Sequence, residues 1–200
     1  LEEFYGRWTR ADADGKARPG RSELLRIGLT KLHANLSRDQ IADPLLAEQV
    51  QAQLGLLWDR LHQDEVHVLE IEKTIRFQYA VDDVQHTITA KIDRIDQLPD
   101  RSLRVIDYKT GKPAKSKARP DPDDLQLGIY RLALDTGFGP DPIGRAEYWL
   151  LASGERGTLN FADMKLDKVR ATIDRAVRGM AMGQFPAATG CSGDCRLFRD

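Results

Sequence analysis

The chain has 200 residues, of which 41% are hydrophobic and 30% charged, and its formal net charge is −1. This length is sufficient for one ordinary domain with its own core. The near-neutral charge excludes a protein that binds nucleic acid through its overall field, so any such contact must depend on a local patch. The sequence has no apolar stretch near the ~20 residues of a membrane helix, no signal-peptide pattern and no disulfide framework. We expect a cytoplasmic protein without a membrane partner.

The first third of the chain predicts helices. Residues 1–10 are typical of a helix, and the segment 11–20, with its glycines and proline, is typical of a loop. Ser22 is a candidate N-cap of a second helix, and Asp43 followed by Pro44 predicts the start of a third. Apolar residues at helical spacing predict the buried stripes of these two helices: Leu24, Leu25, Ile27, Leu32 and Leu36, and then Leu46, Val50, Leu54, Leu57, Trp58 and Leu61.

Alternating apolar and polar residues over 66–79 and 84–96 predict two antiparallel strands with a turn at Asp82 and Asp83. A second turn at 98–101 leads into a third strand that ends at Lys109. Side chains two apart on a strand share a face. One face therefore carries Leu103, Val105, Asp107 and Lys109, and the other carries Arg104, Ile106 and Tyr108.

The pair Asp107 and Lys109 is the most informative feature of this strand. A carboxylate and an ammonium at the end of an apolar strand face are costly to desolvate unless they are paired or in use. A plain ion pair on an edge strand is the alternative. Asp93, at the end of the preceding strand, lies fourteen positions before Asp107 and can reach the same end of the sheet. Two converging carboxylates form a hard-oxygen site suited to Mg²⁺ or Mn²⁺.

The segment after Lys109 is a loop with four basic residues, Lys112, Lys115, Lys117 and Arg119. It is either a solvated loop or a flap that attracts phosphate, and its position beside Asp107 favours the flap. A helix from Asp123 and Asp124 to about residue 135 places Gln126 and Tyr130 on one face. A strand at 145–152 and a helix at 165–182 complete the predicted elements; Val169, Ile173, Val177 and Met180 of that helix are expected to face inward.

Three motifs in this order resemble the PD-(D/E)xK nucleases and, among them, the RecB-type family. They are A-K-I-D-R-I-D at 90–96, D-Y-K-T-G-K at 107–112 and Q-L-G-I-Y at 126–130. The resemblance covers the chain from about Leu69 onward and less securely the part before it. It implies an α/β fold of the restriction-endonuclease-like type, with a mixed central sheet flanked by helices.

The resemblance also implies roles for single residues. Asp93, Asp107 and the backbone carbonyl of Tyr108 are implied as ligands of Mg²⁺ or Mn²⁺. Asp93, Asp107 and Lys109 form the implied catalytic set, with Lys109 orienting or deprotonating the attacking water and offsetting the phosphate charge. The residues implied to position DNA are Gln126, Tyr130 and Lys112. For the two helix residues among them, ordinary helix packing is the alternative.

The family also carries a helical G-x-x-x-H motif whose histidine completes the metal site. Gly28 and His33 are one residue too far apart for this motif. We therefore expect the motif upstream of Leu1, with His33 as the alternative metal ligand. Without the histidine, metal binding and turnover should be weak. Glu72 matches a family acid near the hairpin, although an exposed or supporting strand residue is the simpler interpretation.

The last residues resemble the C-terminal cysteine cluster of iron–sulfur members of the family. Cys191 and Cys195 are separated by three residues, where the family pair is separated by two. Two thiolates cannot hold a four-iron cluster, which takes four. A complete cluster would therefore need a longer chain, and two free thiols or a disulfide is the alternative.

These observations predict a nuclease domain at 1–185, lacking its histidine motif, and a tail at 186–200 with a partial cysteine cluster. We expect a metal-dependent deoxyribonuclease, an exonuclease of DNA repair or recombination, with DNA as substrate and a helicase as partner. The alternatives are a catalytically silent DNA-binding or scaffold domain of a helicase–nuclease complex, and a plain interaction domain. The intact charged trio argues against both, because a domain without catalysis has no physical reason to keep costly charges at strand ends.

Overall fold

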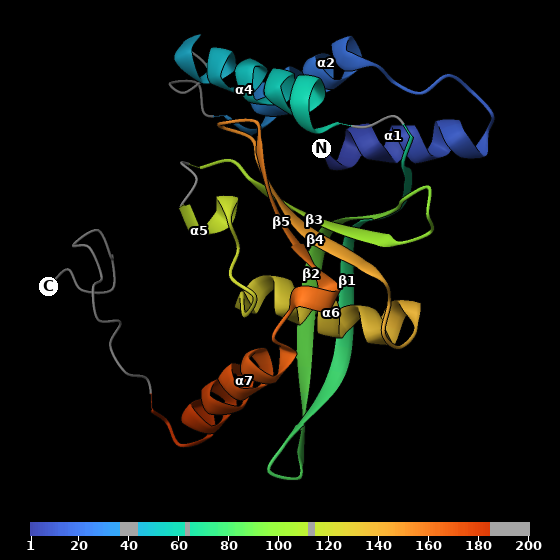
Figure 1. Cartoon of the computed structure of the whole chain (residues 1–200). Coiled ribbons are helices and arrows are strands. Elements are labelled where there is room, and N and C mark those ends of the chain that lie inside the picture. Colours follow the sequence, from blue (N-terminus) through green and yellow to red (C-terminus); the bar gives the residue numbers. More distant parts are fainter. Residues whose placement is uncertain (37–43, 63–64, 112–114, 185–200) are drawn as a thin grey trace, which may run out of the picture.

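The computed structural model describes residues 1–36, 44–62, 65–111 and 115–184. Its centre is a five-stranded sheet in which the strands lie side by side in the order of the sequence (Figure 1). β3 and β4 run parallel, and the other neighbouring pairs are antiparallel. The strands are β1 (His67–Val81), β2 (Val84–Gln97), β3 (Leu103–Lys109), β4 (Gly144–Leu150) and β5 (Glu155–Asn160). This mixed sheet and its flanking helices confirm the predicted α/β fold.

The helices form a layer on each side of the sheet (Figure 1). One layer holds α1 (Glu2–Ala13), α2 (Arg21–Asn35) and α4 (Pro44–Leu56), which continues into the turn η1 (Leu57–Leu61). The other holds α6 (Leu125–Phe138) and α7 (Leu166–Ala181), with the short α5 (Lys115–Ala118) and η2 (Phe161–Asp163) beside them. No helix in the described part of the chain combines the length and the apolar character needed to cross a bilayer.

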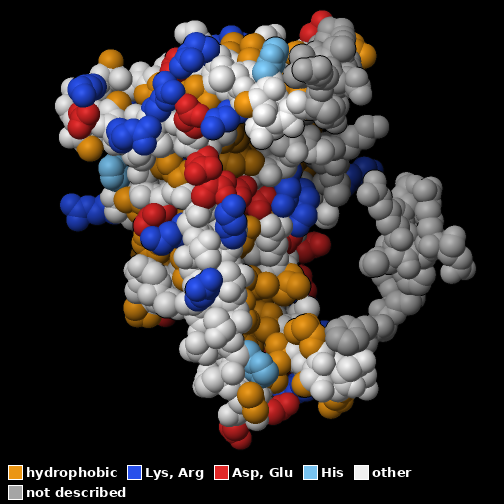
Figure 2. Space-filling view, turned by 180° about the vertical axis from the view of Figure 1, so that it is seen from behind, with side chains coloured by type: hydrophobic (Ala, Val, Ile, Leu, Met, Phe, Trp, Pro, Cys, Tyr) orange, Lys and Arg blue, Asp and Glu red, His pale blue; other side chains and the backbone are white. Residues whose placement is uncertain are grey.

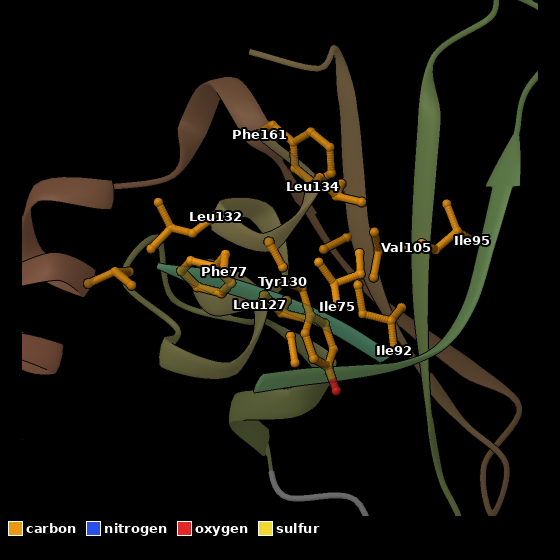
Figure 3. Packing of buried hydrophobic residues seen from close by; sticks show 14 of the residues in the cluster. Ile75, Phe77, Ile92, Ile95, Val105, Leu127, Tyr130, Leu132, Leu134 and Phe161 are labelled. Atoms are coloured by element: carbon orange, nitrogen blue, oxygen red, sulfur yellow. The ribbon is translucent and has the colours of Figure 1, made fainter. Parts of the chain in front are cut away.

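The alternation of β3 divides the hydrophobic core into two clusters. Leu103 and Val105 pack in the first cluster, between the sheet and α6 and α7, whereas Ile106 packs in the second, under α1, α2 and α4. Figure 3 shows side chains of α6 meeting those of the strands in the first cluster. The predicted two faces of this strand are therefore confirmed, and the face with Asp107 is the one toward α6.

Close packing of α6 against α7 depends on Gly128. A Cβ at this position would lie 2.5 Å from Cγ2 of Val169, well inside van der Waals contact. The two helices can approach this closely only because residue 128 has no side chain.

The predicted turns are confirmed. Asp82 and Asp83 both have left-handed backbone, with φ of 50° and 62°, as a two-residue hairpin turn requires. In the second turn the amide of Arg101 donates to the carbonyl of Leu98 at 2.9 Å.

A break in the alternation of the β1–β2 hairpin surrounds Asp93. Ile71 packs against the second cluster while Ile75 belongs to the first, although a regular strand would place both on one face. Between them Glu72 has a left-handed φ of 50°. Asp93 lies within β2, which continues to Gln97, and not at its end as expected, because β2 goes on to pair with the start of β3.

Several local expectations were wrong. Gly20 caps α2 with extended backbone, and Ser22 lies inside the first turn. α1 continues to Ala13, into the segment predicted as a loop. Met180 is 57% exposed instead of inward, because α7 passes beyond the edge of the core there. β5 was not predicted. α4 does begin at Pro44, and Asp43 lies outside the described residues.

Candidate active site

Asp93 and Asp107 lie on neighbouring strands and face the same region. The Oδ2 atom of Asp93 accepts a hydrogen bond of 2.8 Å from the backbone N–H of Tyr108, so the carboxylate is fixed beside the end of β3. Burial raises the pKa of Asp93, and the nearby carboxylate of Asp107 adds to this. The structure therefore brings together the two acids that the sequence predicts as metal ligands.

Asp107 is only 4% exposed, and its two oxygens differ. Oδ1 accepts hydrogen bonds from Nε2 of Gln126 at 2.6 Å and from the hydroxyl of Tyr130 at 2.9 Å. Nζ of Lys109 lies 2.6 Å from Oδ2 as an ion pair. Among the described residues, however, no group donates a well-oriented hydrogen bond to this buried Oδ2 atom. One carboxylate oxygen is thus held in place while the other keeps a lone pair for a further partner.

The side-chain amide of Gln126 contacts both Asp107 and Lys109. Its Nε2 donates to Asp107 and also to the hydroxyl of Tyr130 at 2.8 Å. Its Oε1 accepts from Nζ of Lys109 at 3.2 Å. The sequence placed Gln126 and Tyr130 on one helix face, and the structure directs that face at Asp107. In Figure 3 the hydroxyl of Tyr130 points out of the hydrophobic cluster.

A second layer of polar contacts lies behind Gln126, and the sequence analysis missed most of it. The hydroxyl of Tyr148, on β4, donates to Oδ1 of Asp124 at 2.8 Å and lies 3.3 Å from Oε1 of Gln126. Lys117 donates to the same hydroxyl at 2.7 Å and to Oδ2 of Asp124 at 3.1 Å. Lys117, expected in a phosphate-attracting flap, is therefore paired within the protein. The only sequence signal for Tyr148 is a hydroxyl within an otherwise apolar strand.

Burial sets the protonation behaviour of this region. It raises the pKa of Asp93 above its usual value, and the nearby carboxylates of Asp107 and Glu72 raise it further, against the amide of Tyr108 and the ammonium of Lys109. Burial also raises the pKa of Tyr130 well above the ordinary value of a phenol, and the charge of Asp107 adds to this. The phenol therefore keeps its proton and acts as a hydrogen-bond donor.

The donor set suits a divalent cation. Two carboxylates supply the hard oxygens that Mg²⁺ and Mn²⁺ prefer, and the Oδ2 atom of Asp107 accepts no well-oriented hydrogen bond from the described residues. A cation between the carboxylates would also offset the burial and the repulsion from Asp107 that raise the pKa of Asp93. Within the described ranges, no group of three or more His, Cys, Asp and Glu side chains is placed to hold a metal. The fit therefore depends on these two carboxylates together with backbone or solvent oxygens.

Of the other predicted residues that the structure describes, His33 is not gathered at this site, whereas Glu72 lies close enough to Asp93 to affect its charge. His33 is exposed on α2, and no metal-binding group of described residues includes it. Glu72 forms an ion pair with Lys91. Lys112, Cys191 and Cys195 lie outside the described residues.

Alternate side chains of the same strands form a separate charged group, which the sequence analysis did not predict. We call Arg94, Asp96 and Arg104 the buried ion cluster, and all three side chains are 0% exposed. Arg94 donates to both oxygens of Asp96 at 2.6 and 2.8 Å, and Arg104 donates to Oδ2 at 2.6 Å. The Arg94 guanidinium lies 3.9 Å from the ring centroid of Tyr5, which ties α1 to the sheet.

Exposed charges of both signs lie on one face of the molecule. Figure 2 shows acidic side chains near the middle of one face, with lysine and arginine side chains on both sides of them. This mixture agrees with a net charge near zero and with recognition through a local patch.

The comparisons with known proteins bear on this arrangement. A solved structure described as "Crystal structure of SSO0001" has 19% sequence identity and a TM-score of 0.44, over 92% of this chain and 86% of that chain, a similarity too low to support a conclusion. No curated protein sequence matches the chain. A family model described as "PD-(D/E)XK nuclease superfamily" matches residues 1–197 and so includes both strands and the helix that hold the carboxylates, Lys109 and Gln126. The chain belongs to the PD-(D/E)XK nuclease superfamily.

Proposed function

We propose that this chain is a RecB-type nuclease domain that hydrolyses phosphodiester bonds of DNA with Mg²⁺ or Mn²⁺, as an exonuclease of repair or recombination. Its superfamily comprises nucleases that in general use divalent metals. The observation that supports the proposal best is Asp107, whose Oδ1 is fixed by Gln126 and Tyr130 while its buried Oδ2 forms an ion pair with the partly exposed Lys109.

In this proposal Asp93, Asp107 and the carbonyl of Tyr108 hold the cation. When bound, the cation supplies Lewis-acid activation of water and charge compensation at the phosphate. Asp93 is kept in place by the N–H of Tyr108, and Asp107 by Gln126 and Tyr130, so that both carboxylates are oriented before substrate arrives. Such preorganisation lowers the cost of reaching the transition state.

Lys109 supplies the positive charge that a phosphodiester needs as negative charge builds up on its oxygens. Its side chain is 31% exposed, and Oε1 of Gln126 accepts a hydrogen bond from its ammonium. The ammonium can therefore turn from Asp107 toward a phosphate without losing the contact with Gln126. In this position it orients the attacking water and can exchange a proton with it.

The proposal extends to the organisation of the chain. Residues 1–185 form the nuclease domain, and 186–200 a tail that carries Cys191 and Cys195. A helicase is the proposed partner, because a nuclease of this type needs a supply of accessible strand ends.

The test is cleavage of end-labelled linear and circular DNA, single- and double-stranded, and of matched RNA, with Mg²⁺ or Mn²⁺. The variant is Lys109→Ala. The matched control is Lys73→Ala, which removes a lysine that pairs with Glu70 on β1. We expect cleavage of DNA but not RNA, a rate about 10²–10⁴-fold lower in Lys109→Ala, and an unchanged rate in Lys73→Ala.

Each other outcome has a distinct meaning. Cleavage of circular DNA would show that the chain acts as an endonuclease and not as an exonuclease. DNA binding without cleavage in the unmodified chain would favour the silent scaffold domain. Cleavage that persists in Lys109→Ala would show that the activity belongs to another site or to a contaminant.

A further inference from the structure

A cavity of about 500 Å³ adjoins the candidate active site. Ala90 and Lys91 of β2 form one wall, and Leu125 and Ile129 of α6 form another. Gln126 and Tyr130 also line it, and these are the two side chains that donate to Asp107. A group in this cavity would therefore contact the same side chains that orient the carboxylate, next to where a phosphate would lie.

The lining of the cavity combines an apolar floor with a charged rim. Leu125 is 42% exposed, and Ile129 is partly buried next to it, so both aliphatic side chains are available to an occupant of the cavity. Lys91 is 63% exposed at the rim. Lys117 lies on the other side of the opening and pairs with Asp124. A fitting occupant has a flat apolar body with an anionic group attached, which describes a nucleotide unit.

Asp124 does not oppose an anionic occupant. Burial alone would raise the pKa of this carboxyl, but hydrogen bonds from the N–H of Leu127, the hydroxyl of Tyr148 and the ammonium of Lys117 lower it below the usual value. Its negative charge is therefore engaged within the protein by three donors. Lys91 at the rim pairs with Glu72, and such an exposed ion pair is weak enough for a phosphate to replace the carboxylate.

We propose that this cavity receives one unpaired nucleobase, that of a nucleotide next to the scissile phosphate, with Leu125 and Ile129 against the face of the base. This inference rests on the proposed function and deepens it. Bases in a duplex are stacked and paired, so a base can enter such a cavity only from an unpaired strand or after it is turned out of the helix. The proposal therefore requires the two DNA strands to be separated at the point of cleavage.

The first test measures DNA binding by fluorescence anisotropy in Lys109→Ala protein, so that cleavage does not interfere. The added variant is Leu125→Ser, at the first position of α6, where serine is tolerated. The control is Ile143→Ser, which changes an aliphatic side chain that is 81% exposed and distant in sequence. We expect Leu125→Ser to weaken binding of a single-stranded oligonucleotide by roughly fivefold or more, the lower range for one base contact, with no change in Ile143→Ser.

The second test leaves Leu125 and Ile129 intact and changes the ligand. A single abasic residue is moved along the labelled oligonucleotide, again with Lys109→Ala protein. We expect one position at which the abasic residue weakens binding, and we expect Leu125→Ser to be insensitive at that position. Equal affinity for intact and abasic strands at every position would overturn the proposal, as would unchanged binding in Leu125→Ser. Both readouts are affinities, so a chain that binds but does not cleave would refute the nuclease and leave the base cavity testable.

Discussion

The buried ion cluster and the candidate active site are built from alternate residues of the same two strands, yet they differ in how far their charges are satisfied. In the buried ion cluster both oxygens of Asp96 accept hydrogen bonds from arginines, and nothing is exposed. At the candidate active site, Oδ2 of Asp107 forms an ion pair with Lys109, whose side chain is partly exposed, and accepts no well-oriented hydrogen bond from the described residues. Strand alternation thus separates a group of charges that is complete from one that can accept a ligand.

This difference gives the two groups different expected roles. Completely paired buried charges fix the packing of the helices against the sheet, and removing one member leaves another uncompensated. An incomplete group with two carboxylates close together instead favours an added cation. Substitutions in the buried ion cluster should therefore affect stability, and substitutions at the candidate active site should affect activity.

Asp107→Asn should have the largest effect of the substitutions considered. The change keeps the shape and one acceptor oxygen for Gln126 and Tyr130, but it removes the charge that would hold the cation. We expect the cleavage rate to fall by about 10³-fold or more, comparable to the loss of a preorganised transition-state contact. Binding of Mn²⁺, measured by calorimetry, should be lost as well, with Tm nearly unchanged.

The control for this variant is Asp83→Asn, in the hairpin turn, where asparagine tolerates the left-handed φ of 62°. It should retain both cleavage and Mn²⁺ binding. A large fall in Tm for Asp107→Asn would remove the distinction between the two charged groups.

Asp96→Asn should act on stability. It removes the carboxylate charge that both Arg94 and Arg104 contact, and we expect the free energy of unfolding in urea to fall by about 3–5 kcal/mol. Replacing Arg94, Asp96 and Arg104 together by Met, Leu and Met should recover most of this loss, because a well-packed apolar group does not leave a charge unpaired. Unchanged stability in Asp96→Asn would mean that the buried ion cluster does not hold the helices in place.

The strand with Asp107 and the helix with Gln126 and Tyr130 were predictable because each pattern is local. Alternation in β3 and one-turn spacing in α6 determine which side chains share a face, and neither depends on contacts with other elements. The grouping of these residues follows once the helix packs on that face of the sheet. Their catalytic roles stay predictions.

Other parts depend on contacts between distant segments, and no local pattern encodes those. Lys117 meets Tyr148 only because β4 lies parallel to β3 and α5 lies over it. The buried ion cluster requires Arg104 to lie opposite Asp96 across two antiparallel strands. β5 is short and bordered by turns, so that its few alternating residues gave little signal.

Gly157→Ala should give a smaller effect, confined to the candidate active site. A Cβ at this position would lie 1.9 Å from the backbone oxygen of Lys117, so α5 must move away. Since α5 is short, we expect it to shift without unfolding the sheet, displacing Lys117 from Tyr148. Cleavage should fall several-fold with little change in Tm. Gly6→Ala is the control, because its nearest neighbour is a flexible arginine at 3.6 Å.

If Gly157→Ala leaves the cleavage rate unchanged, Lys117 and Tyr148 do not help to orient Gln126. A loss of stability as large as that expected for Asp96→Asn would instead place α5 among the elements that hold the sheet together.

Asp93→Asn removes a proposed cation ligand and should lower cleavage as Asp107→Asn does, but its effect on Tm should be the smallest considered and should depend on pH. Because the pKa of Asp93 is raised in the folded state by burial and then by Asp107, the folded chain binds this proton more tightly than the unfolded chain. Stability from this group is therefore full below the ordinary carboxyl pKa of about 3.9 and is lost as the pH rises through the folded pKa. At neutral pH the ionised Asp93 destabilises the fold, so Asp93→Asn should have the higher Tm, and the difference should vanish in acid.

Asp82→Asn provides a control of opposite sign, because Arg178 lowers the pKa of Asp82, and loss of that pairing should lower Tm slightly at neutral pH. Added Mg²⁺ sharpens the test. If the cation binds between Asp93 and Asp107, it removes the repulsion that destabilises the unmodified chain, and its Tm should rise while that of Asp93→Asn stays constant. An equal rise in both chains would place the cation elsewhere, and the charges of the candidate active site would then be an ion pair like those of the buried ion cluster.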